Sequence, residues 1–476
     1  MHAMPGRAGC RPTRASLAGS RMDPLPTRME LLLMADSEEL EALAAEAFIY
    51  GFPLVFDLQE VDRFRREGMG SVAPAPFNSF SHATQLAGPG DRFVSINNDT
   101  VYSIAQLDVS GGPVRLEVPD SSGRYYVLQF IDAWTNNFAY VGHRATGTKA
   151  GTYLLVAQGW DGTVADGETV IRFPTAVATI LGRWAVDGEE DMAAVRELQA
   201  RLTLMPTSDG GDGLPPPDNA ADDALLTFEQ MRVWMQAFPP AERDIEYQRR
   251  FAPLGLLEPT SPYVSPDPAL ATALINGLAA GREHIEETLK HGASPEVNGW
   301  KLTYHAFDYN LDFFEIGALD DPRWKIADPK LRYIERALSA RGGLWGNHGY
   351  EAAYAMVYND SEGTQLDGAN RYTVGLPTSP PVGAFWSITM YDLPDFYLVA
   401  NPIGRYSIGD RTPGLQYGDD GSLTITIQRD EPATPEARAN WLPSPPGQFR
   451  PILRMYEPAN AVLDGEYELP PIVRIN

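Results

Sequence analysis

Hydrophobic residues recur with two different periods along the chain, and the changes of period divide it into regions. From about residue 77 to 186, short runs such as YYVLQFIDAW and TYLLVAQGW are rich in β-branched and aromatic residues and are separated by Gly, Pro and Asp. Such runs predict strands joined by turns. From about residue 188 to 345 apolar residues repeat at helical spacing, as in Leu270, Leu274 and Leu278. Beyond about residue 350 the strand pattern returns.

This order predicts an α+β protein that is mainly β. We expect two antiparallel β-sandwich or jelly-roll-like domains with a helical middle segment, because no helix interrupts the strand runs. The expected boundaries are a disordered leader over 1–35, N-terminal helices plus the first β domain over 36–187, a helical connecting segment over 188–347 and the second β domain over 348–476. Within the N-terminal part, Ser37 begins a helix and Gly51-Phe52-Pro53 breaks it before a second helix.

The charge of the chain excludes several classes of partner. Lys and Arg number 38 against 63 Asp and Glu, so the net charge is 38 − 63 = −25. A surface this acidic repels nucleic acid and anionic lipid, and we expect no nucleic-acid partner. No run of about 18 apolar residues occurs, so no transmembrane segment is expected. The apolar block at 31–34 is too short for a secretory signal, which predicts a cytoplasmic protein by default.

Motifs for metals and cofactors are missing. The single cysteine, Cys10, excludes a multi-cysteine metal site, and His284 and His291 stand two helical turns apart, too far to share one metal ion. No G-x-G-x-x-G follows a strand, and residues 142–149 resemble a P-loop with its Thr and Lys in reversed order and a strand behind them. We therefore expect neither a metal nor an organic cofactor.

Polar side chains gather at the ends of several predicted strands. The segments NNDTVYS and DAWTNN are dense in amides, acids and aromatic residues, which suit a pocket for a small polar ligand. The candidate catalytic residues are Asp99, Asp132 and His348. The candidate substrate-binding residues are Asn97, Asn98, Tyr102, Trp134, Asn136, Asn137 and Arg405.

Each candidate has a structural alternative. Asp99 and Asp132 form an acid/base pair of the glycosidase kind if they face each other, but Asp99 could simply cap a turn. Trp134 could stack on a sugar ring or fill a core. Arg405 could clamp a carboxylate of the ligand or pair with Asp410.

Longer blocks of the sequence carry a family resemblance. The segments FNSFSHATQL, INNDTVYSIAQLDVS and FPTAVATILGRW resemble the family of domains of unknown function numbered 1254. The segments FWSITMYD, LVANPIGRYSIGDRT and NWLPSPPGQFRPILRMYEP resemble the family numbered 1214. This tandem resemblance implies a mostly β architecture with a jelly-roll-like carboxyl-terminal part, and it implies no reaction. Many such relatives begin with a secretion signal, so a periplasmic or secreted location stays open.

Two functions of different class fit these observations. The first is a hydrolase or lyase without an organic cofactor, acting on a small polar, sugar-like substrate. The helical middle segment slightly favours this function, because a binding protein made of β-sandwiches alone would not need it. The second is a non-catalytic ligand-binding or cell-envelope-associated protein. Assembly into a homo-oligomer is compatible with either. An enzyme should bury a titratable pair in a cleft, whereas a binding protein should offer an aromatic platform without such a pair.

Overall fold

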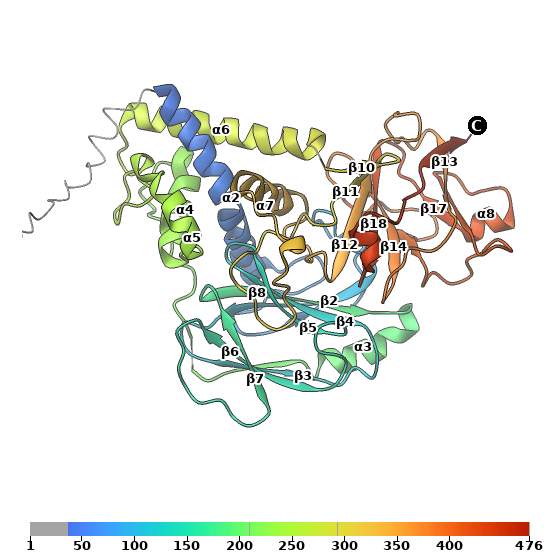
Figure 1. The fold of residues 1–476 in the computed structure, drawn as a ribbon, viewed down its shortest axis with the longest axis horizontal. Helices are drawn as coiled ribbons and strands as arrows, with labels where there is room; N and C mark the ends of the chain where they lie inside the picture. Colours follow the sequence, from blue (N-terminus) through green and yellow to red (C-terminus); the bar gives the residue numbers. More distant parts are fainter. Residues whose placement is uncertain (1–36, 209, 293, 476) are drawn as a thin grey trace, which may run out of the picture.

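The computed structural model describes residues 37–208, 210–292 and 294–475. Two β domains and a layer of helices make up this part of the chain (Figure 1). The leader predicted over 1–35, with Cys10, lies outside the described residues. In the described ranges no helix is long and apolar enough to cross a membrane.

The first β domain packs two sheets around one hydrophobic core. Its five-stranded sheet has the order β1 (Ser81–His82), β2 (Thr100–Asp108), β8 (Val177–Ala185), β4 (Tyr126–Asp132), β5 (Asn137–Gly142). Its four-stranded sheet has the order β7 (Glu168–Phe173), β6 (Gly151–Ala157), β3 (Val114–Val118), β9 (Thr203–Pro206). Phe138 of one sheet meets Phe173 beside the other, with ring centroids 5.2 Å apart. All pairings are antiparallel except that of β6 with β7.

Helices cover the outer face of the five-stranded sheet (Figure 1). They are α2 (Ser37–Glu67), α4 (Leu226–Ala237), α5 (Glu242–Arg249), α6 (Pro268–His291) and α7 (Pro329–Gly343). Trp134, at the end of β4, packs among them in one core with Tyr50 and Leu274. The helix break expected at residues 51–53 is wrong, because α2 runs through Pro53. Gly51 instead gives room to Met231 of α4, whose Sδ would lie 2.5 Å from a Cβ at that position.

The second β domain repeats the two-sheet plan. Its six-stranded sheet has the order β10 (Glu296–Val297), β11 (Trp300–Leu302), β12 (Ala352–Val357), β18 (Phe449–Tyr456), β14 (Trp386–Asp392), β15 (Ser407–Gly409). Its four-stranded sheet has the order β17 (Trp441–Pro443), β16 (Leu423–Gln428), β13 (Arg371–Leu376), β19 (Ile472–Ile475). The pair β16–β17 is parallel and the other pairings are antiparallel. Leu423, Ile425 and Ile427 alternate into the shared core, as their spacing predicts.

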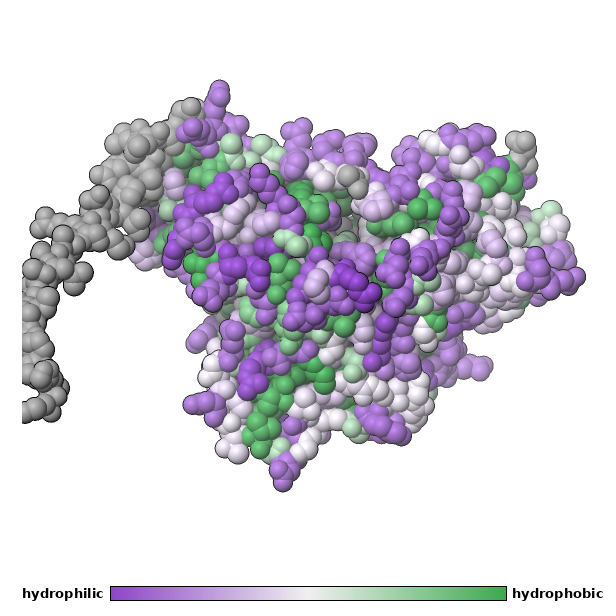
Figure 2. All heavy atoms as spheres, in the orientation of Figure 1, coloured by the Kyte–Doolittle hydropathy of each residue, from purple (hydrophilic) through white to green (hydrophobic). Residues whose placement is uncertain are grey.

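The prediction of an α+β protein with antiparallel sheets is confirmed. The segment 188–347 contains more than helices, because β9 joins the first domain and β10 and β11 join the second. The remaining short helices are α3 (Met192–Gln199), α8 (Pro435–Ala439), α9 (Asn460–Leu463) and the 3₁₀ turns η1 (Glu189–Asp191), η2 (Asp223–Leu225), η3 (Ala252–Leu254), η4 (Pro322–Trp324). The face seen in Figure 2 is mostly hydrophilic, with separate apolar areas, as the high content of acidic residues predicts.

Candidate functional site

The side chains of strand β18 alternate between the core of the second domain and a cavity on the other side of the sheet. Leu453 and Met455 enter the core of the second domain, whereas Arg450, Ile452 and Arg454 line a cavity on the other side of the sheet. Strand side chains alternate between faces, so residues two apart share one side. The six-stranded sheet thus turns one apolar face inward and one cationic face towards the first domain.

The cavity lies where the two β domains and the helices meet. Its volume is about 140 Å³. Strand β8 contributes Leu181 and Arg183, the loop 93–97 borders it, and α6 and α7 close it from the helical side. Much of its lining is apolar, with Phe93, Phe307 and Trp345 among its aromatic rings. Junctions of domains are a common place for ligand pockets, so this cavity is the candidate site.

Two of its arginines hold Ser95 of the bordering loop, one through its side chain and one through its backbone. Nη2 of Arg450 donates a 2.6 Å hydrogen bond to Oγ of Ser95, and Nη2 of Arg454 donates one of 2.6 Å to the carbonyl oxygen of Ser95. Ser95 has a φ of 52°, in the left-handed region. Few non-glycine residues adopt this conformation, and here the two guanidinium groups fix it.

The third arginine is held from the first domain. Nη1 of Arg183 donates to Oε1 of Gln129 at 2.6 Å and to Oδ1 of Asn347 at 3.2 Å. Its Nη2 donates to the carbonyl oxygen of Trp345 at 2.8 Å. These acceptors are all neutral, so they orient the guanidinium group without neutralising its charge.

The three cations are deeply buried and form no ion pair with a carboxylate in the described part of the chain. Arg183, Arg450 and Arg454 expose 5%, 1% and 4% of their surface. Among the described residues none of them forms an ion pair with Asp or Glu, and Nε of Arg450 has no hydrogen-bond partner. Burial opposes the charge of Arg454, yet nearby tyrosines and Asp99 keep its pKa above the ordinary value. Buried charges without a partner are costly, typically several kcal/mol per ion.

Phenol groups stand between these cations. Tyr102 and Tyr456 each interact electrostatically with both Arg183 and Arg454. The oxygen of Tyr354 accepts hydrogen bonds from the backbone N–H of Asn347 at 3.0 Å and from its Nδ2 at 3.3 Å. Burial raises the pKa of Tyr102 and Tyr456, so both keep their protons at neutral pH and can donate hydrogen bonds.

One acid lines the helical side of the cavity. Glu335 of α7 is half-buried, and its side chain has no hydrogen bond or ion pair within the described part of the chain. Burial raises the pKa of this carboxyl group. A titratable group in a cleft with a pKa shifted by burial is a candidate for function.

The candidate Asp99 takes part in the domain junction. Its Oδ2 accepts a hydrogen bond of 2.7 Å from Oγ of Ser387, and its carbonyl oxygen accepts one of 2.7 Å from Arg411. The preceding Asn97 forms a turn, since its Oδ1 accepts from the backbone N–H of Asp99 at 3.1 Å and of Thr100 at 3.2 Å. These contacts fix the start of β2 against the second domain.

The candidate Asp132 organises a turn at the other end of the sheet. Its Oδ1 accepts hydrogen bonds from the backbone N–H of Trp134 at 2.9 Å and of Asn136 at 2.8 Å, and its Oδ2 accepts from Nδ2 of Asn136 at 2.9 Å. Burial raises the pKa of Asp132 to about 6, because its effect is larger than that of these hydrogen bonds, which lower the pKa. Oδ1 of Asn136 in turn accepts from Arg336 of α7 at 3.0 Å.

The two aspartates cannot act together. Thr100, next to Asp99, pairs with Ala185 at one end of β8, whereas Asp132 pairs with Ala178 at the other end. At a rise of 3.3 Å per residue these positions are roughly 23 Å apart. The hypothesis of a glycosidase-like acid/base pair is therefore wrong.

Other candidates also lie away from the cavity. Nε1 of Trp134 donates to the carbonyl oxygen of Phe238 at 2.8 Å, within the helical core rather than at a ligand wall. Arg405 donates to the carbonyl oxygens of Ala439 at 3.0 Å and Trp441 at 2.9 Å, and burial lowers its pKa. Asn98 is held through Nδ2 by the carbonyl oxygen of Ala87 at 2.5 Å. Of the ten candidates, Asn97 and Tyr102 line the cavity.

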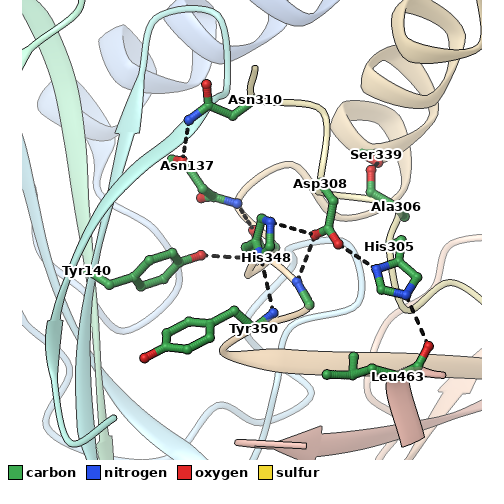
Figure 3. Close-up of polar contacts among 12 residues, drawn as sticks. Asn137, Tyr140, His305, Ala306, Asp308, Asn310, Ser339, His348, Tyr350 and Leu463 are labelled. Carbon is green, nitrogen blue, oxygen red and sulfur yellow. Dashed lines mark hydrogen bonds and ion pairs between the residues drawn. The ribbon is translucent and has the colours of Figure 1, made fainter. Parts of the chain in front are cut away.

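His348 belongs to a separate cluster (Figure 3). The buried carboxylate of Asp308 lies between two imidazoles, with Nδ1 of His305 at 2.6 Å and Nε2 of His348 at 3.3 Å. Nε2 of His305 meets the carbonyl oxygen of Leu463 at 3.2 Å, so both its nitrogens face acceptors, which favours the protonated ring. Nδ1 of His348 accepts from the backbone N–H of Tyr350 at 3.0 Å, so this ring is neutral. Burial lowers the pKa of His348.

The cluster stands behind the cavity wall and holds no metal site. His348 and Asn137 border a small crevice distinct from the cavity. Ala306 and Ser339, joined by a 2.8 Å hydrogen bond, line the cavity beside the loop that carries His305 (Figure 3). Across residues 37–208, 210–292 and 294–475, no group of three or more His, Cys, Asp or Glu could hold a metal ion.

The cavity arginines were missed in the sequence, although a signal exists. Arg450 and Arg454 are four apart in FRPILRMY, and Arg183 stands within VATILGRWA; the structure forms a buried strand from each segment. Two cations at even spacing in an apolar strand must share one face, which indicates a buried polar surface.

Comparison with known proteins agrees with the resemblance seen in the sequence. A family model described as protein of unknown function DUF1254 matches residues 77–206, and one described as protein of unknown function DUF1214 matches residues 351–460. The crystal structure of the VPA0106 protein from Vibrio parahaemolyticus is similar over 92% of this chain and 100% of its own, with a TM-score of 0.67 and 24% identity, which shows a shared fold.

A putative uncharacterized protein from Burkholderia cenocepacia aligns over 91% of this chain and 89% of its own, with a TM-score of 0.42 and 12% identity. No curated protein matches. The chain is therefore a tandem of the family of unknown function numbered 1254, in its amino-terminal half, and the family of unknown function numbered 1214, in its carboxyl-terminal half.

Proposed function

We propose that the protein binds a small organic anion with an apolar body in the cavity at the domain junction. The observation that carries the proposal is the burial of Arg183, Arg450 and Arg454 around one cavity without an ion-paired carboxylate. Guanidinium groups match carboxylates with paired hydrogen bonds, and such charge-assisted bonds are the stronger kind. A bound anion would supply the missing counter-charge.

The remaining lining defines the rest of the ligand. Leu181, Leu289 and Phe307 present apolar surface next to the cations. Burial of apolar area contributes about 25 cal/mol per Å². A carboxylate with an aliphatic or aromatic body would contact both the cations and the apolar side chains. A sugar would leave the apolar side chains without an apolar group to pack against.

A second candidate is a hydrolase or lyase acting on such an anion without an organic cofactor. It is favoured by Glu335, a carboxylic acid in the same cavity with a raised pKa. A carboxyl group of this kind can deliver a proton to a leaving group. The aspartates expected from the sequence have no place in this version, because neither lines the cavity.

Binding can be tested with a matched pair of probes. We expect 3-phenylpropanoate to raise the melting temperature and to bind in calorimetry, and its uncharged amide to do neither. Arg454→Gln should abolish the effect. Arg438→Gln should keep it, because Arg438 is an exposed residue of α8 that pairs with Glu431 at 3.3 Å. Equal binding of the amide, or full binding by a folded Arg454→Gln variant, would overturn the proposal.

We also propose that the second domain is of jelly-roll type, that the protein acts in the cytoplasm and that copies of the chain assemble into a homo-oligomer. A crystal structure, fractionation of cells and light scattering, respectively, test them.

A further inference from the structure

The two sides of the junction cavity differ in charge. The strand side carries Arg183 and Arg454, whereas the helical side carries Glu335. A ligand that spans the cavity therefore meets cations on one side and an acid on the other. A ligand with only a negative charge would place no cation next to Glu335.

Helix α7 adds to this polarity through its orientation. The residues that line the cavity are Glu335, Leu338, Ser339, Gly342 and Gly343, spaced as one helical stripe in the last turns of α7. The C-terminal end of a helix carries about half a negative charge. The carboxylate and the helix end thus favour a cation on the same side.

The lysine that lines the cavity is held at the end of another helix. Nζ of Lys301 donates at 2.5 Å to the carbonyl oxygen of Lys290 in the last turn of α6. Its ammonium group lies 5.6 Å from the centre of the Tyr358 ring. Lys301 therefore serves the end of α6.

The two arginines of α7 nearest to Glu335 in the sequence are also engaged elsewhere. Arg332 forms an ion pair with Asp244 at 3.1 Å, and Arg336 donates to Oδ1 of Asn136 at 3.0 Å. Both are buried away from the cavity stripe. Glu335 is left as an acid without a partner among the described residues, facing the cavity.

We infer that the ligand is a zwitterion, with a carboxylate bound between Arg183 and Arg454 and an ammonium or quaternary ammonium group bound at Glu335. This inference rests on the proposed function and adds the second charge to it. The rings of Phe307 and Trp345 line the cavity, and aromatic faces attract such cations. The ligand class is an amino acid or a betaine with an apolar spacer.

Binding of such a ligand has a proton balance. Burial raises the pKa of Glu335 in the free protein. A cation beside it favours the carboxylate and lowers that pKa, so any proton held by Glu335 leaves to solvent as the ion pair forms. No bond of the ligand breaks in this step.

The test compares molecules that differ only in the amino group. The probes are ω-amino acids from β-alanine to 8-aminooctanoate and the n-alkanoates of matching length, titrated by calorimetry into the full chain. The variants are Glu335→Gln and, as a control of equal charge change, Glu283→Gln. Glu283 is exposed on α6 and does not line the cavity. Titration in buffers of different ionisation enthalpy counts the protons released.

The expected result is a gain of about tenfold in affinity from the amino group at the best chain length, equal to about 1.4 kcal/mol. Glu335→Gln should reduce that gain to less than about twofold and stop proton release, and Glu283→Gln should change neither. Equal affinity of amino acids and alkanoates at every length would overturn the zwitterion and leave the anion site standing. Absence of binding by both series would overturn both.

Discussion

Nδ1 of His305 donates a 2.6 Å hydrogen bond to Oδ2 of Asp308, a carboxylate with no exposed surface. The imidazole also contacts the carbonyl oxygen of Leu463, so this one ring ties the loop at 303–308 to the second domain. Thr303, Ala306 and Phe307 of that loop line the cavity. The contacts of His305 therefore contribute to the shape of the site as well as to the stability of the fold.

This pair predicts a loss of stability as the pH rises above about 6.5. Burial lowers the pKa of His305, but the hydrogen bond and charge of Asp308 outweigh it, and the pKa is raised. A base with a raised pKa contributes stability that is fully present below its unfolded pKa, about 6.5, and is lost as the pH rises through the folded value. The free energy of unfolding in urea should show this fall, and His305→Gln should remove it.

The difference between wild type and variant reports His305 together with its coupling to His348. Burial lowers the pKa of His348 in both proteins, whereas the charge of His305 lowers it further only in wild type. His284→Gln serves as the control, since His284 is exposed on α6. An identical pH dependence for wild type and His305→Gln would contradict the prediction.

The buried carboxyl group of Glu351 predicts a second dependence of stability on pH, over a different pH range. Burial raises its pKa to about 8, and Glu457 adds to the shift, while Tyr125 donates a 2.7 Å hydrogen bond to its Oε1. The carboxyl group is therefore protonated at neutral pH. The folded protein binds this proton more tightly than the unfolded one, so stability falls as the pH rises from about 4.5 to about 8.

Replacement of this acid should relieve the penalty. Glu351→Gln keeps the volume and cannot ionise, so it should be more stable than wild type by a few kcal/mol at about pH 9 and by less at about pH 5. Unfolding in urea at both pH values measures this. Glu362→Gln is the control, because Glu362 is exposed. A variant that loses stability equally at both pH values would show that the charge of Glu351 is needed.

Trp134 predicts an effect on stability without an effect on binding. Trp134→Phe loses the hydrogen bond to the carbonyl oxygen of Phe238 and leaves a void beside Tyr50, whose ring centroid is 5.2 Å away. The expected cost is about 1–3 kcal/mol. The affinity for 3-phenylpropanoate should not change, because Trp134 does not line the cavity. A weaker affinity at unchanged stability would restore the stacking role considered from the sequence.

The sequence predicts those features of the fold that depend on residues close together along the chain. The alternation of Ile425 and Ile427 places a strand with one face in the core, and the structure agrees. Pro53 misleads, because the packing of α2 against α4, α6 and α7 offsets the hydrogen bond that proline removes, a cost of about 3 kcal/mol.

The candidate site was harder to predict, because its parts meet only in the folded chain. Arg183 and Arg454 lie far apart in the sequence and come from different domains. The dense polar segments instead hydrogen-bond the backbone of turns, as Asp132 does with two backbone N–H groups. Residue type alone does not separate a turn-forming Asp from a catalytic one, since both roles use the same acceptor oxygens.

Asp99 provides the sharpest remaining distinction between a catalytic and a structural carboxylate. It is the acid whose charge acts on Arg454, and Tyr456 bonds it at 3.4 Å. Asp99→Asn keeps an acceptor for Oγ of Ser387 and removes the negative charge. If Arg454 binds the ligand's anion, loss of this competing charge should increase the affinity for 3-phenylpropanoate severalfold, with a melting temperature within a few degrees of wild type. Calorimetry decides it: an unchanged or weaker affinity in a folded variant would mean that the charge of Asp99 does not reach the site.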